Sequence, residues 1–145
     1  MDTNHELYMR KALEEARVAA EEGEIPVGAV VVCRHKIIAR SHNQTERLGD
    51  VTAHAEMLAV TMAAASLGGK YLNDCTLYVT LEPCTMCAGA LAWAQLGGLV
   101  YGAPDPERGY NRLSPAPLHP KTAVISGVLE EECSTLLKAF FKARR

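Results

Sequence analysis

Two short clusters of metal-ligating residues lie thirty residues apart in this chain of 145 residues. The first contains His54 and Glu56, and the second contains Cys84 and Cys87 in the run Pro83-Cys84-Thr85-Met86-Cys87. Two thiolates and one imidazole suit a zinc ion, and three protein ligands leave the fourth tetrahedral position for water. The residue types therefore predict a zinc site of the hydrolytic kind, with His54, Cys84 and Cys87 as its ligands.

The spacing within each cluster fits this chemistry. Cys84 and Cys87 are three residues apart, so both sulfurs would lie on one face of a helix that begins there. The first turn of a helix carries partial positive charge, which favours the thiolate form that binds metals. Because two thiolates cancel the charge of the zinc ion, the ion needs a base to help it to deprotonate water. Glu56, two residues after His54, is placed to accept that proton, and we predict that it is the catalytic proton shuttle.

A structural zinc site is the alternative interpretation of the same cysteine pair. Such a site needs a fourth protein ligand, and the candidates are Cys33, Cys75, Cys133 and His119. Each of the three cysteines stands alone in an apolar or amphipathic segment, where buried and unreactive cysteine is common. We therefore favour the open, catalytic site.

The hydrophobic pattern predicts helices and strands that alternate along the chain. The β-branched run Ile25–Val32 predicts a strand buried on both faces, whereas Ala53–Ala65 is apolar nearly all round, which is typical of a helix inside a core. Residues 41–52 have the composition of a loop, and five of the seven prolines fall between residues 104 and 120, which predicts a long ordered loop or lid. The predicted helices span residues 4–22, 53–65, 84–95 and 129–145, and the predicted strands span 25–32, 36–40, 76–80, 99–101 and 122–125, the first two forming a hairpin.

This order of elements predicts a single α/β domain over residues 1–145, with a mixed sheet between helical layers. The composition, 48% hydrophobic and 22% charged, is that of an ordinary globular protein. The longest apolar runs, such as Val27–Cys33, are far shorter than the roughly 20 residues that span a bilayer. The polar, acidic start lacks the pattern of a secretion signal, and five cysteines, an odd number, argue against a disulfide framework. These features predict a cytoplasmic protein without a membrane segment.

The charge distribution gives little sign of nucleic-acid binding. The net charge of −2 provides no general basic surface. Residues 138–145, however, carry four basic residues and no acidic one. A polyanion would therefore have to meet a local patch at this end of the chain.

The two ligand clusters together form a known signature. The pattern H-x-E followed by P-C-x-x-C is that of the zinc-dependent deaminases that act on nucleobases. Over roughly its whole length, the chain resembles the tRNA-specific adenosine deaminases of that superfamily. The stretches that carry the resemblance are Ile25-Pro26-Val27-Gly28-Ala29-Val30, Thr52-Ala53-His54-Ala55-Glu56, residues 77–90, Gly102-Ala103 with Asp105, and Phe140-Phe141-Lys142-Ala143-Arg144-Arg145.

The resemblance implies a fold, an assembly and an activity. The fold is the three-layer α/β/α arrangement of cytidine deaminases, with a mixed sheet of about five strands. The assembly is a homodimer in which each active site is bordered by the partner subunit. The implied activity is hydrolytic deamination of adenosine to inosine at wobble position 34 of tRNA, with the anticodon stem-loop as the binding partner.

The resemblance also implies roles for individual residues. It assigns one Zn²⁺ per subunit to the histidine and the two cysteines already named, the proton shuttle to Glu56, and no organic cofactor. In the substrate pocket, Asn43 and the backbone amide of Ala55 would contact the target base. Asp105 would lie next to the sugar of the nucleotide.

Other functions remain open at this point. Leu91-Ala92-Trp93-Ala94-Gln95 resembles the guanine deaminases, and Pro104 stands where the tRNA enzymes often carry an arginine, so deamination of guanine or another free base or nucleoside is the alternative. The mononucleotide cytidine deaminases usually have cysteine in place of His54, which disfavours them. From a different class, the chain could be a non-catalytic, zinc-stabilised RNA-binding subunit.

Overall fold

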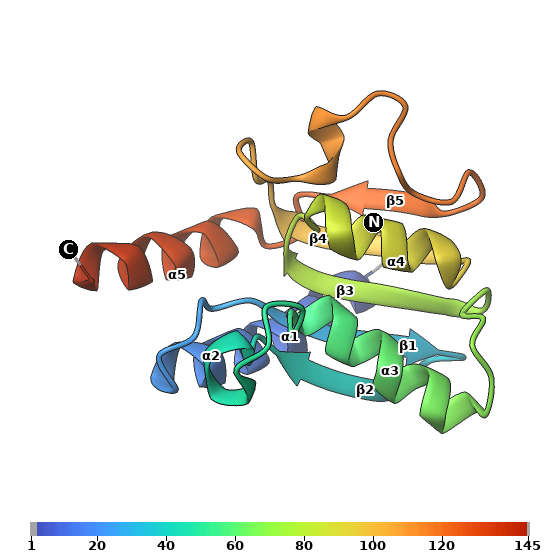
Figure 1. Cartoon of the computed structure of the whole chain (residues 1–145), viewed down its shortest axis with the longest axis horizontal. Coiled ribbons are helices and arrows are strands. Elements are labelled where there is room, and N and C mark those ends of the chain that lie inside the picture. Colours follow the sequence, from blue (N-terminus) through green and yellow to red (C-terminus); the bar gives the residue numbers. More distant parts are fainter. Residues whose placement is uncertain (1–2, 145) are drawn as a thin grey trace.

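A mixed sheet of five strands runs through the centre of the computed structural model, which describes residues 3–144 (Figure 1). The strands follow the spatial order β2-β1-β3-β4-β5. β1 is antiparallel to both of its neighbours, whereas β3, β4 and β5 run parallel to one another. The predicted mixed sheet and the predicted hairpin of the first two strands are both confirmed. The strands are β1 (Gly28–Cys33), β2 (Lys36–His42), β3 (Cys75–Leu81), β4 (Gly98–Ala103) and β5 (Ala123–Ser126).

Helices cover both faces of this sheet. α1 and α5 lie on one face, and α3 and α4 lie next to each other on the opposite face (Figure 1). The three-layer α/β/α arrangement is therefore confirmed. The helices are α1 (Thr3–Glu21), α2 (Thr45–Leu48), α3 (Ala55–Leu67), α4 (Thr85–Trp93) and α5 (Glu130–Ala143).

The β1 strand shows why this sheet needs helices on both sides. All six of its residues are buried. Alternate side chains of a strand point to opposite faces, and Ala29 and Val31 accordingly join one core cluster while Val30 joins the other. The run therefore forms a strand buried on both faces, as predicted, but over Gly28–Cys33; Ile25, where the strand was predicted to begin, precedes it and is exposed.

Two segments differ from the sequence-based expectation. The helix predicted inside a core, α3, buries only one side, and Met62 on its other side is exposed. Residues 41–52 were predicted to be a loop, but they contain the end of β2 and the short helix α2. The carboxylate of Glu24 accepts hydrogen bonds from the backbone amides of Glu46 and Arg47 at the start of α2. Such a long-range contact leaves no trace in the local pattern.

The proline-rich segment is a long loop, as predicted, interrupted only by the 3-10 turn Tyr110–Arg112. The predicted closing helix corresponds to α5, although Arg145, where we expected it to end, lies outside the described residues. Across residues 3–144, none of the helices has the length and apolar content that crossing a membrane requires.

Candidate metal and catalytic site

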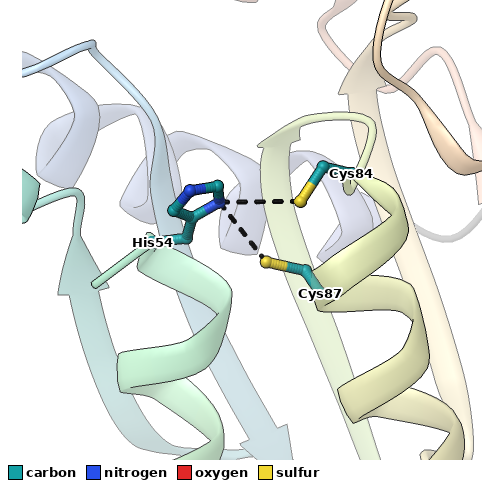
Figure 2. Close-up of side chains that lie close together, drawn as sticks. All are labelled: His54, Cys84 and Cys87. Atoms are coloured by element: carbon teal, nitrogen blue, oxygen red, sulfur yellow. Dashed lines mark hydrogen bonds between the residues drawn. The ribbon is translucent and has the colours of Figure 1, made fainter. Parts of the chain in front are cut away.

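Two helix starts bring the predicted metal ligands together. His54 is the N-cap of α3, and Cys84 is the N-cap of α4, both with extended backbone. Cys87 lies within the first turn of α4, three residues after Cys84, as the spacing predicted. Because α3 and α4 lie next to each other, the three side chains meet between the starts of the two helices (Figure 2).

The geometry of these three side chains fits a zinc ion. The Nδ1 atom of His54 lies 3.7 Å from the Sγ atom of Cys84 and 3.5 Å from the Sγ atom of Cys87. Ordinary zinc–nitrogen and zinc–sulfur bonds in tetrahedral geometry place the two donor atoms about 3.5 Å apart. All three donor atoms lie within 4.8 Å of one another. The site therefore needs little rearrangement to hold zinc.

A fourth protein ligand is absent among residues 3–144, where this group of three is the one cluster that could hold a metal ion. The candidates for a structural site, Cys33, Cys75 and Cys133, are buried elsewhere in the core, and His119 is in the proline-rich loop. Three ligands and a free fourth position are typical of a catalytic zinc site rather than a structural one.

The protonation of the cysteine pair prepares the site for a cation. A hydrogen bond from Cys87, followed by one from His54, lowers the pKa of Cys84 to about 4 despite the opposing effect of burial. The same contact with the Cys84 thiolate raises the pKa of Cys87, and the hydrogen bond to Cys84 raises the pKa of His54. Without metal, Cys84 is therefore the thiolate of the pair and Cys87 retains its proton.

Glu56 lies in the first turn of α3 and is buried, with 4% of its surface exposed. Burial is the largest cause that raises the pKa of this carboxyl from 4.5 to about 7. A carboxyl with a pKa close to the working pH can both accept and return a proton. Its place beside His54 and Cys87 suits the predicted role of proton shuttle, and it does not join the group of metal ligands.

Asn43 and Ala55, the two residues predicted to contact the base, are joined to each other. The Asn43 side-chain oxygen accepts a 2.7 Å hydrogen bond from the Ala55 backbone amide. This bond fixes the orientation of the Asn43 amide group and engages the Ala55 amide that was predicted to face the base. The Asn43 Nδ2 group makes no hydrogen bond with any residue between 3 and 144, so its donors are available to a ligand.

A cavity of about 720 Å³ opens beside the predicted metal ligands. Its volume lies within the usual range for small-molecule and cofactor sites. The segments that line it come from α2, the start of α3, the residues just before α4, the loop after β4, and α5, which lie around one end of the sheet (Figure 1). The lining includes His54, Glu56, Cys84, Asn43 and Asp105.

Asp105, predicted to lie beside the sugar, is on the loop that follows β4. Its Oδ1 atom accepts hydrogen bonds from the backbone amides of Glu107 and Arg108, at 3.2 and 3.1 Å. The carboxylate therefore stabilises its own turn while it lines the cavity. The structure places Asp105 on the same cavity as the predicted metal ligands His54 and Cys84.

Two buried carboxylates, Glu24 and Glu82, were missed by the sequence analysis. Each is almost fully enclosed and accepts backbone hydrogen bonds beside the cavity, Glu24 from α2 and Glu82 from the loop after β4. The only local signal is a glutamate within an apolar or proline-containing run, as in Leu81-Glu82-Pro83. That signal does not identify the backbone amides that the carboxylate contacts.

Comparisons with known proteins agree with this site. A family model described as the cytidine and deoxycytidylate deaminase zinc-binding region matches residues 2–103. A tRNA-specific adenosine deaminase of Bacillus subtilis (strain 168) is 47% identical over 148 residues, which cover 99% of this chain and 92% of that protein. A similar enzyme of Agrobacterium fabrum is 46% identical and covers 95% of this chain and 94% of its own length.

Solved structures give the same result. One, from studies of A-to-I editing by tRNA:A34 deaminases at the wobble position of transfer RNA, has a TM-score of 0.85 and 45% identity, covering 90% of this chain and 99% of its own. A guanine deaminase from Nitrosomonas europaea has a TM-score of 0.79 and 26% identity, covering 93% and 83% of the two chains. In sequence, the chain is more similar to the tRNA enzyme than to this guanine deaminase.

Proposed function

We infer that this chain, which belongs to the cytidine and deoxycytidylate deaminase family and, within it, to the tRNA-specific adenosine deaminases, converts adenosine to inosine at wobble position 34 of tRNA by zinc-dependent hydrolysis. The single observation that carries this proposal is the open group of His54, Cys84 and Cys87, whose members His54 and Cys84 line one cavity with the buried carboxyl of Glu56. A metal site with a free position beside a proton carrier is suited to hydrolysis.

The mechanism depends on proton transfer by Glu56. Zinc held by His54, Cys84 and Cys87 would supply the activated water that hydrolysis consumes. Glu56 accepts a proton from that water and donates it to the ring nitrogen of adenine as the water oxygen bonds to C6. It then carries the proton of the new C6 hydroxyl to the amine, which leaves as ammonia when its bond to C6 breaks. Its raised pKa matches this cycle because the carboxyl must be able to change its protonation state near neutral pH.

We propose that Asn43 orients the base. The Ala55 amide holds the Asn43 oxygen, so the Nδ2 group is the end of the side chain that can donate to an acceptor on the purine. The base has to leave its stack to enter a cavity of this kind, which favours the single-stranded loop of an anticodon as substrate. In the same proposal, Asp105 lies beside the sugar.

The remaining wall of the cavity offers suitable contacts for RNA. Lys138 and Phe141 of α5 line it, together with Arg108 of the loop after β4. Phe141 is exposed and can stack on an unpaired base, while the two cations can approach phosphates. α5 also carries Lys142, and Arg144 follows as its C-cap residue. The RNA-binding surface is therefore local, in agreement with the small net charge of the whole chain.

The test of the proposed function is deamination of an anticodon stem-loop that carries adenosine at its first anticodon position. The purified zinc protein should convert that adenosine to inosine, and Glu56→Ala should abolish conversion while zinc remains bound. In cells, depletion of the protein should remove inosine from the first anticodon position of tRNA. Conversion of the RNA by zinc-loaded Glu56→Ala would contradict the role of Glu56.

Deamination of free guanine is the second candidate function, supported by the similarity of Leu91–Gln95 to the guanine deaminases. Salt separates the two activities, because RNA binding through phosphates weakens steeply as salt rises whereas binding of a neutral base barely changes. We expect the RNA reaction to show that steep dependence. Rapid release of ammonia from free guanine without any RNA reaction would favour the second function.

We also propose that the protein is a homodimer that forms through the outer face of α3 and α4. Trp93 has 86% of its surface exposed and Met62 has 41%, although both belong to largely apolar helices. Exposed apolar patches of this kind mark protein interfaces, and a two-fold axis would bring the same face of a second copy against it. Analytical ultracentrifugation should find a dimer, and Trp93→Glu should shift it to the monomer.

The remaining expectations follow from the same function. We propose that residues 1–145 act as one deaminase domain and that the protein works in the cytoplasm, where its tRNA substrate is found. The five cysteines are free in the structure, which suits a reducing compartment. Fractionation of cells followed by immunoblotting would test the location.

A further inference from the structure

The loop that follows β4 is held in place by one buried carboxylate, that of Glu82. This residue follows β3, two residues before the metal ligand Cys84, and has only 5% of its surface exposed. Its Oε1 atom accepts a hydrogen bond from the backbone amide of Asp105, and its Oε2 atom accepts one from the amide of Asn111, both at 3.0 Å. One carboxylate therefore joins the two ends of the loop between these residues.

The loop approaches this carboxylate closely at Gly109. A β-carbon added to Gly109 would lie 2.0 Å from the Glu82 Oε2 atom and 2.5 Å from the backbone oxygen of Asp105. The backbone of Gly109 is extended, with φ of −65°, so glycine is required here by lack of space rather than by its dihedral angles. The loop and the carboxylate thus fit together only without a side chain at this position.

The same loop contacts the backbone of the metal-binding segment. Gly109 forms a β-bridge with Cys84, and the amide of Tyr110 donates a 3.0 Å hydrogen bond to the carbonyl of Pro83. Glu82 lies two residues before Cys84. The loop is therefore fixed relative to the metal ligands through Glu82 and through these backbone contacts.

We propose that Glu82 is a positioning residue that keeps the 105–111 loop in the form that receives the RNA. This inference rests on the proposed function. The loop carries Asp105, Glu107 and Arg108 on the wall of the cavity, so its position decides where these side chains meet the nucleotides around the target base. Glu82 itself contacts backbone amides and acts on the substrate only through the loop.

The proposal predicts a specific kinetic signature for Glu82→Gln. A glutamine has one oxygen to accept a hydrogen bond, and its NH₂ group would face a backbone amide that needs an acceptor. A smaller fraction of the protein molecules would then have the loop in its binding form before RNA arrives. The apparent affinity for RNA falls in proportion to that fraction. Once RNA is bound and the loop is ordered, the chemical step should proceed as before. KM should rise about tenfold or more while kcat stays within about threefold.

The experiment compares the zinc-loaded wild type, Glu82→Gln and Glu131→Gln on the anticodon stem-loop. Glu131 is exposed on α5, so its substitution makes the same change of charge without touching the loop. Zinc content and melting temperature are measured for each protein, and amide hydrogen exchange is followed at Asp105 and Asn111. We expect a raised KM and faster exchange in Glu82→Gln alone, with one zinc per chain retained.

Gly109→Ala provides a second test in case Glu82→Gln does not fold. It retains the carboxylate and displaces the loop from the opposite side, so it should give the same rise in KM. An unchanged KM in folded Glu82→Gln or Gly109→Ala overturns the proposal, as does a fall in kcat that accompanies loss of zinc. If wild-type protein does not convert the RNA, the proposed function fails, and unchanged exchange at the two amides would separately refute the contact between carboxylate and loop.

Discussion

His54 and Cys84 occupy equivalent positions in two different helices, each as the N-cap, and the Nδ1 and Sγ atoms of the two residues lie 3.7 Å apart. The partial positive charges of both helix starts therefore point toward one place. This arrangement favours anions there and acts in the same direction as the hydrogen bonds from Cys87 and His54 that lower the pKa of Cys84. It also places Glu56 and Cys87 within the first turns of the two helices, beside the same point.

Removal of one sulfur should remove the metal. Cys87→Ala leaves two ligands, and we expect it to lose most of its zinc and to lower kcat/KM by more than about 100-fold, because changes even outside the ligand set cost 10- to 100-fold. Zinc per chain is measured by mass spectrometry of the metal after dialysis. Cys75→Ala is the matched control, since Cys75 is buried in β3 and does not belong to the group of ligands. Equal zinc content in the two variants would show that Cys87 is not a ligand.

The raised pKa of Glu56 should make the stability of the zinc-free protein depend on pH. In the folded chain the carboxyl titrates at about 7, against 4.5 ordinarily. Between these values the folded state retains a proton that the unfolded state has lost, so the free energy of unfolding falls as pH rises. The fall amounts to about 3 kcal/mol across the window. Below pH 4.5 the carboxyl is protonated in both states and contributes no slope.

Urea unfolding of zinc-free wild type and Glu56→Gln at pH 5 and pH 7.5 measures this effect. Groups remote from Glu56 are common to both proteins and cancel, whereas His54 and Cys87, whose pKa values the Glu56 carboxylate raises, titrate together with it and are part of the measured difference. Relative to wild type, Glu56→Gln should become more stable by about 2 kcal/mol as pH rises from the lower value to the higher, the part of the full window that lies between them. Glu131→Gln, an exposed substitution, should show no such change. A constant difference between wild type and Glu56→Gln would mean that the buried carboxyl titrates normally.

Asn43→Asp separates base binding from folding. Aspartate retains the Oδ1 acceptor for the Ala55 amide and replaces the Nδ2 donors by a second acceptor. We expect kcat/KM on the stem-loop to fall about tenfold or more, as for the loss of one buried hydrogen bond to the substrate. Melting temperature should fall less than in Asn43→Ala, which leaves the Ala55 amide without its partner. If Asn43→Asp retained full kcat/KM, the Nδ2 group would have no part in binding the base.

The metal site could be predicted from sequence because its information is local. The three-residue interval between Cys84 and Cys87 places both sulfurs at one helix start, and the apolar patterns around them define the helices. The strands could be predicted for the same reason, since continuous β-branched residues such as those of β1 indicate burial on both faces. Each of these features depends on residues within one element.

The organisation of the loops could not be predicted, because it depends on pairs far apart in the chain. Glu82 contacts the amide of Asn111, and Glu24 contacts that of Arg47, so each carboxylate serves a loop more than twenty residues away. Backbone amides have no sequence identity that a pattern could match. The exposed side of α3 also gave no signal, because the residues on its exposed and buried sides are both largely apolar, as Met62 and Ala59 show.

Substitution of Glu24 should loosen the wall of the cavity opposite the loop after β4. Its carboxylate accepts hydrogen bonds from the amides of Glu46 and Arg47, at 3.1 and 2.8 Å, and α2 has no side-chain cap of its own. Thr45, the first residue of that helix, lines the cavity. Glu24→Gln leaves one of the two amides without an acceptor, which should lower the free energy of unfolding by about 1–3 kcal/mol.

The local effect of Glu24→Gln is measured by hydrogen exchange. The amides of Glu46 and Arg47 should exchange faster because they lose an acceptor. The amides of β1 do not bond to this carboxylate, so their exchange should change only as far as the global free energy of unfolding changes. Glu21→Gln is the matched control, because Glu21 is exposed near the end of α1 and the charge change is the same. KM for the stem-loop should also rise, since Thr45 and Asn43 lie on the loosened segment. Unchanged exchange at both amides in a folded Glu24→Gln protein would show that α2 does not depend on the Glu24 carboxylate. The short helix would then be encoded by its own residues, within reach of a local sequence pattern.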